Sequence, residues 1–178
     1  MRCFIAVDIN DELKTEILPL QKELARIADA KLVEPENLHF TLKFLGGIDN
    51  RTLAEAKNML GKVSAGFKPF SASAKGMDAF PDINYIRVVW IGCPELYNLQ
   101  KAVDDSLSPL FRKERKINPH LTLARIRSER NKEALADFIN KNKAIEIGSF
   151  RVEEIKLKVS MLTPKGPVYE DVDVWKLR

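Results

Sequence analysis

One four-residue pattern, His-x-Thr-Leu, occurs twice in this chain, as HFTL from His39 and as HLTL from His120. These are the two histidines of the chain, and 81 positions separate them. The chain has five threonines, so a threonine two places after both histidines has a chance probability of about one in a thousand. Each motif also reads as a strand that follows a helix. The repeat therefore predicts two similar lobes that face each other across a cleft.

Successive side chains of a strand point to opposite faces. His39 and Thr41 therefore share one face of their strand, while Phe40 and Leu42 share the other. The second motif repeats this alternation. We expect the apolar faces to join the core and the polar faces to line the cleft. The four predicted cleft residues are His39, Thr41, His120 and Thr122.

Two imidazoles in one cleft indicate acid–base chemistry. Imidazole titrates near pH 6.5, so one ring can accept a proton while the other donates one. Threonine hydroxyls can bind phosphate oxygens. A single strand histidine is more often a packed residue than a catalyst, and the repeat is what favours function here. Which histidine is the base stays open.

Strands and helices are mixed rather than strictly alternating, which indicates an α+β fold. The first helix should begin at Asn10 or Asp11 and kink at Pro19. Because no flexible linker interrupts the pattern, we expect residues 1–178 to form a single bilobal domain of mostly antiparallel sheet with helices packed outside. Strands are expected near 2–8, 31–33, 38–45, 71–77 and 85–91, from 119, and near 144–150, 151–162 and 167–178, with a TPKGP turn before the last, and further helices near 52–63, 95–112 and 132–140.

Composition excludes several classes of protein. The chain is 45% hydrophobic and 30% charged, as soluble globular proteins are. Its longest apolar runs, CFIAV and VVWIGC, are far shorter than the ~20 residues of a membrane-spanning helix. Asp8 closes the first run, which leaves no room for a signal peptide, so we expect a cytoplasmic protein. Cys3 and Cys93 lie in apolar runs, which favours buried thiols over a disulfide.

The segments HFTLKFLG and HLTLAR resemble the twin signatures of the two-histidine phosphoesterase superfamily, and more narrowly of the RNA 2′,3′-cyclic phosphodiesterases, also called 2′-5′ RNA ligases. The opening RCFIAVDI, the strand IRVVWIG and the ending EIKLKVSMLTPKGPVYEDVDVWKL are similar to that family as well. The resemblance implies a bilobal α+β fold with pseudo-twofold symmetry and no metal or other cofactor. It implies as partners RNA ends with a 2′,3′-cyclic phosphate or a 5′-hydroxyl, tRNA fragments among them.

The same resemblance assigns roles to the motif residues. His39 and His120 become the acid–base pair, and Thr41 and Thr122 bind the nonbridging phosphate oxygens. Water attacks the cyclic phosphate to leave a 2′-phosphate, and an RNA 5′-hydroxyl in place of water gives a 2′-5′ bond.

Two cations near the motifs are further candidates for phosphate binding. Lys43 follows Thr41 by two residues, so alternation places it on the cleft face; the alternative is an ordinary surface lysine. Arg125 matches a family arginine that binds phosphate. Strict alternation, however, places Arg125 opposite His120, and it can reach the phosphate only if the strand ends or bulges near Ala124.

A basic run, FRKERK at residues 111–116, precedes the second motif, and Arg125, Arg127 and Arg130 follow. With a net charge of +4 and a pI of about 9.0, these cations could guide RNA to the site. The alternative is a solvated helix end. Among aromatic residues that could stack a base, we expect Phe40 in the core and Tyr85 and Trp90 in the framework.

Two other classes remain as alternatives. A noncatalytic RNA-binding module could use the same basic cleft, although binding alone would not require paired proton carriers. A metallohydrolase could use both histidines as ligands, but no H-E-x-x-H or comparable ligand spacing occurs.

Overall fold

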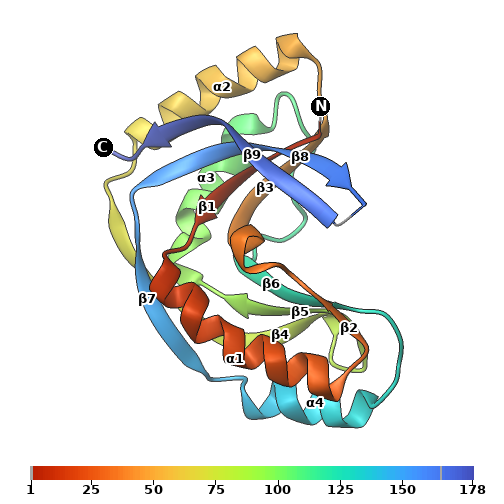
Figure 1. The fold of residues 1–178 in the computed structure, drawn as a ribbon. Coiled ribbons are helices and arrows are strands. Elements are labelled where there is room, and N and C mark those ends of the chain that lie inside the picture. Colours follow the sequence, from red (N-terminus) through yellow and green to blue (C-terminus); the bar gives the residue numbers. More distant parts are fainter. Residues whose placement is uncertain (1, 165) are drawn as a thin grey trace.

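The computed structural model describes residues 2–164 and 166–178. In these residues the strands form two antiparallel sheets, and helices lie on the outer side of each (Figure 1). The elements are β1 (Arg2–Asp8), α1 (Asp11–Ile27), β2 (Ala30–Leu32), β3 (His39–Gly47), α2 (Asn50–Ala65), β4 (Phe70–Asp82), β5 (Tyr85–Gly92), α3 (Tyr97–Leu107), β6 (His120–Ile126), α4 (Lys132–Lys141), β7 (Glu146–Val152), β8 (Glu154–Thr163) and β9 (Gly166–Lys176), with short 3₁₀ turns at Pro35–Asn37 and Pro94–Leu96.

The motif strands have similar neighbours in the two sheets. The first has the strand order β3-β1-β8-β9, and the second has the order β2-β6-β5-β4-β7. In each sheet the strand that carries a motif lies beside an inner strand, β1 or β5. Helices α2 and α3 pack on the first sheet, α1 and α4 pack on the second, and β3 contacts β6 where the lobes meet. This arrangement confirms the predicted α+β fold with two related lobes.

The lobes do not follow the order of the sequence. The first sheet combines β1 and β3 with β8 and β9, which come from the opposite end of the chain, whereas the second sheet uses the middle of the chain. In Figure 1 the red and blue strands accordingly lie side by side in the upper lobe.

Most elements form where the sequence predicts them. Helix α1 begins after Asn10, whose side chain accepts a hydrogen bond from the backbone N–H of Leu13 at 3.1 Å, as an N-cap does. It runs through Pro19 as one helix. The largest differences in length from the prediction are in β4, which extends to Asp82, and in α3, which ends at Leu107 rather than near Arg112.

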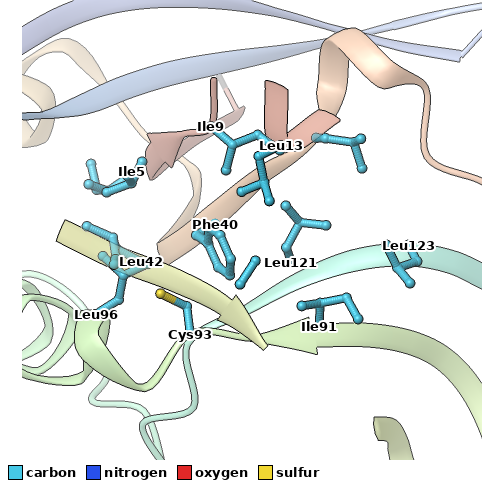
Figure 2. Packing of buried hydrophobic residues seen from close by; sticks show 14 of the residues in the cluster. Ile5, Ile9, Leu13, Phe40, Leu42, Ile91, Cys93, Leu96, Leu121 and Leu123 are labelled. Atoms are coloured by element: carbon cyan, nitrogen blue, oxygen red, sulfur yellow. The ribbon is translucent and has the colours of Figure 1, made fainter. Parts of the chain in front are cut away.

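The core lies between the two motif strands. Phe40, Leu42, Leu121 and Leu123 are all buried, and Figure 2 shows them among side chains from both lobes. The Phe40 ring stacks on Phe150 with 5.5 Å between the centroids. The apolar faces of both motifs therefore form the core, as the alternation predicts.

Cys3 and Cys93 are buried and free, which confirms the sequence-based prediction. Burial raises the pKa of the Cys93 thiol to about 12. In the predicted TPKGP turn, Lys165 lies outside the described residues. No helix in the described part of the chain has the length and apolar character to cross a membrane.

Candidate active site

A β-bulge interrupts each motif strand at the same place. In β3 the register with β1 shifts between Thr41 and Lys43, so that Leu42 is the extra residue. In β6 the register with β5 shifts between Thr122 and Ala124, which makes Leu123 the extra residue there. Two consecutive residues then face the core, and the side chain that follows returns to the cleft face. That side chain is Phe44 in β3 and Arg125 in β6.

Alternation allows Arg125 to reach the cleft only if its strand ends or bulges near Ala124, and β6 has such a bulge at Leu123. The guanidinium lies on the same side of the strand as His120 and lines a central cavity of about 310 Å³. This central cavity brings together both histidines, both motif threonines and Arg125. Further lining residues include Phe4, Glu34, Asn37, Phe44, Phe80 and Tyr169.

Alternation predicted Lys43 on the cleft face, but Lys43 is not among the residues that line the central cavity. Because of the bulge, its side chain turns inward, where it is 1% exposed and forms an ion pair with Asp104. The Lys43 ammonium also donates a hydrogen bond to the carbonyl of Arg112 at 2.9 Å. Its charge is therefore used inside the protein, in the ion pair with Asp104.

The two imidazoles are held in the same way. His39 Nδ1 lies 2.7 Å from the carbonyl oxygen of Asn37, and His120 Nδ1 lies 2.7 Å from that of Asn118. A carbonyl can only accept, so Nδ1 must carry the hydrogen in each ring and Nε2 is the nitrogen that exchanges a proton. His39 Nε2 lies 2.9 Å from the Thr41 hydroxyl. Both rings thus present the same nitrogen for chemistry.

Aromatic rings fix the orientation of both imidazoles. His39 stacks on Phe4 at 5.0 Å and meets the edge of Tyr169 at 5.5 Å. His120 packs against Phe80 at 4.8 Å and Trp90 at 5.8 Å. Each histidine is therefore confined between apolar surfaces, which restricts its rotamers and partly removes it from water.

This environment disfavours the charged form of both rings. Burial lowers the pKa of His39 to about 4, although the Asn37 carbonyl and Asp8 act in the opposite direction. Burial also lowers the pKa of His120. A bound anion would favour the imidazolium and raise both pKa values. The site therefore couples histidine protonation to the presence of a negatively charged ligand.

Sequence reasoning missed several residues around the cavity. Asn37 is buried, and its side-chain amide donates to the carbonyl of Pro167 at 3.0 Å, which ties the β8–β9 hairpin to the turn before β3. Tyr169 reaches the site from β9, and Phe44 reaches it because of the bulge. An asparagine two residues before each histidine was visible in the sequence, but the contact uses a backbone carbonyl that any residue supplies.

A protein-family model described as LigT like Phosphoesterase matches residues 7–90 and 92–169, one segment around each motif. The chain belongs to the LigT-like phosphoesterase family. The RNA 2′,3′-cyclic phosphodiesterase of Methanothermobacter thermautotrophicus is 43% identical over 183 residues, which cover 99% of each chain. The one from Methanocaldococcus jannaschii is 42% identical over 98% of this chain and 100% of the relative. The crystal structure of TT0787 from Thermus thermophilus has a TM-score of 0.83 at 26% identity, covering 100% of this chain and 98% of that chain.

Family membership identifies the chain as an enzyme, a phosphoesterase of the hydrolase class. Each of the two matched segments contains one motif strand, β3 or β6. Within residues 2–164 and 166–178, no group of three or more His, Cys, Asp or Glu side chains could hold a metal ion.

Proposed function

We propose that this phosphoesterase hydrolyses 2′,3′-cyclic phosphate ends of RNA to 2′-phosphates, with His39 and His120 as its acid–base pair and no metal ion. The names of the relatives at 42–43% identity support the substrate. The observation that carries the mechanism is the shared tautomer, in which each imidazole is fixed through Nδ1 at one central cavity.

The proposed reaction needs two proton transfers. A neutral imidazole takes a proton from water at Nε2 as the water oxygen bonds to phosphorus. The other imidazole is protonated and gives its proton to the 3′ oxygen as the bond from that oxygen to phosphorus breaks. The threonine hydroxyls and the Arg125 guanidinium bind the nonbridging oxygens, on which negative charge accumulates in the transition state.

The same site could join two RNA ends. If an RNA 5′-hydroxyl replaces water, the same transfers form a 2′-5′ bond. The substrates would be ends with a 2′,3′-cyclic phosphate and ends with a 5′-hydroxyl, such as those of tRNA fragments. Ligation and hydrolysis then differ in the nucleophile, while the residues keep their roles.

Incubation with a 2′,3′-cyclic nucleotide, with and without a chelator, tests the proposal. We expect a 2′-phosphate product in both conditions. Product that disappears with the chelator would contradict the metal-free mechanism. Absence of product in every condition, together with RNA binding, would instead favour a noncatalytic RNA-binding module.

A further inference from the structure

The two bulges place unlike side chains at equivalent positions of the motif strands. Arg125 follows His120 by five residues, and Phe44 follows His39 by five. Arg125 brings charge to the central cavity, whereas Phe44 brings a flat apolar ring that is 66% exposed. Core packing does not explain a phenyl ring so exposed, and an exposed ring beside a nucleotide site offers a base a surface for stacking.

Phe44 lies where three cavities adjoin. It lines the central cavity, and it lines a second cavity of about 470 Å³ together with Thr41, His120 and Lys116. It also lines an open groove of about 680 Å³ along residues 111–116. A continuous path therefore leads from the histidines past the Phe44 ring to this segment, which we call the basic loop.

The basic loop presents unpaired positive charge. Four of its residues are cationic, one is acidic, and residues 112–116 are all exposed. Lys113 pairs with Asp105 at 2.6 Å. In the part of the chain that the structure describes, Arg112, Arg115 and Lys116 form no side-chain ion pair or hydrogen bond. These three charges are thus available to an anionic partner.

The loop is also held in place from inside the protein. The buried Lys43 ammonium binds the carbonyl of Arg112. Its ion-pair partner Asp104 accepts hydrogen bonds from the backbone N–H of Glu114 at 3.1 and 3.2 Å. The bulge that turns Phe44 outward therefore also turns Lys43 inward to fix the loop. A loop ordered in advance loses less conformational entropy when a ligand binds.

We propose that the RNA strand on the 5′ side of the cyclic phosphate leaves the central cavity over Phe44, which stacks on a base, and continues along the basic loop, where Arg115 and Lys116 bind its phosphates. Aromatic stacking combined with a basic groove is how proteins bind single strands without strong sequence preference. The inference rests on the proposed function and specifies its substrate as an oligonucleotide end rather than a mononucleotide.

The test compares two substrates with the same reacting end. One is adenosine 2′,3′-cyclic phosphate, and the other is a ten-nucleotide single-stranded RNA that ends in it. For Arg115→Gln/Lys116→Gln we expect the ratio of the oligonucleotide kcat/KM to the mononucleotide kcat/KM to fall about tenfold at low salt. The logarithmic salt dependence of the oligonucleotide kcat/KM should become shallower by about 1.4, or ~0.7 for each lost phosphate contact.

Phe44 is tested with the same pair of substrates. Phe44→Ala should lower the kcat/KM ratio about tenfold, the amount expected for one lost base stack, and should leave the salt dependence unchanged. Phe44→Tyr should restore the ratio because its ring still stacks. The matched control is Lys22→Gln/Lys141→Gln, which removes two exposed charges from α1 and α4 on the outer side of the other lobe. This control variant should leave kcat/KM unchanged for both substrates.

A binding assay separates the two proposals. Fluorescence anisotropy measures affinity for a ten-nucleotide RNA that ends in a 2′-phosphate, which needs no turnover. Weaker binding by the loop and Phe44 variants supports the path even if the wild type hydrolyses nothing, in which case the proposed function alone fails. Binding and kcat/KM ratios equal to those of the control variant would overturn the path while leaving the proposed function intact.

Discussion

Replacement of Lys43 by methionine tests whether the buried ion pair supports the fold. The Lys43 and Asp104 side chains are 1% and 4% exposed. Lys43→Met would leave the Asp104 carboxylate buried with only the backbone N–H of Glu114 in the loop to satisfy it. Removal of one partner of a buried pair costs roughly 3–5 kcal/mol. At ~2–4 °C per kcal/mol for a chain of this size, the Tm should fall by roughly 6–20 °C.

Urea unfolding followed by circular dichroism measures the change in the free energy of unfolding, and two further variants interpret it. Lys14→Met breaks an exposed pair with Asp11 at 3.4 Å, for which we expect a loss below ~1 kcal/mol. Lys43→Met/Asp104→Leu removes both charges and should recover most of the lost stability. Recovery stays incomplete because the Glu114 N–H loses its acceptor. A Lys43→Met loss no larger than that of Lys14→Met would refute the reasoning.

Four further predictions concern the central cavity. His39→Gln and His120→Gln should each lower kcat/KM for a cyclic nucleotide by at least ~10² in steady-state assays; near-normal turnover in either would rule out the paired mechanism. Thr41→Ala and Thr122→Ala should cost ~10² or less, about one oxyanion donor each, and a loss of kcat larger than that of the histidine variants would contradict their role. Because burial lowers the pKa values of both histidines in the free enzyme, the bell-shaped pH profile of kcat/KM should have its maximum below about pH 6.5. The pH profile of kcat should have its maximum at a higher pH, because bound phosphate favours the imidazolium form. A kcat/KM maximum above pH 7 would contradict the effect of burial. The free energy of unfolding should decrease as pH falls from about 6.5 to about 4, with a His39 contribution of up to roughly 3 kcal/mol, because unfolded His39 takes up a proton that the folded ring with a pKa of about 4 excludes. Denaturant titrations of wild type and His39→Gln provide the comparison: the variant should lose the His39 contribution and keep that of His120, whose pKa burial also lowers.

Simple strand alternation predicted the first part of each motif and failed at one point. His39, Phe40, Thr41 and Leu42 lie on the faces that a period of two requires. Lys43 does not, because the extra residue that makes the bulge leaves no mark in the apolar pattern. In the second motif, the phosphate-binding role that the family resemblance implied for Arg125 conflicted with alternation, and that conflict pointed to the bulge.

The sequence alone did not predict contacts between side chains that are far apart along the chain. The partner of Lys43 is Asp104, 61 positions away on α3, and nothing local marks that carboxylate as buried. The early end of α3 has a local cause instead. Pro109 lies two residues after Leu107, and proline both lacks the backbone N–H that a continued helix needs and disfavours the helical conformation of the residue before it.

The pairing of β1 with β8 has a consequence for synthesis of the protein. Arg2 lies opposite Ser160, and Ala6 lies opposite Lys156, so the ribosome makes one strand about 150 residues before its neighbour. The second sheet can close while β8 and β9 are still unmade, because its strands end at Val152. The surroundings of His39 are completed later, because Tyr169, which packs against its ring, is in β9. A nascent chain would therefore contain both histidines well before the surroundings of His39 are complete.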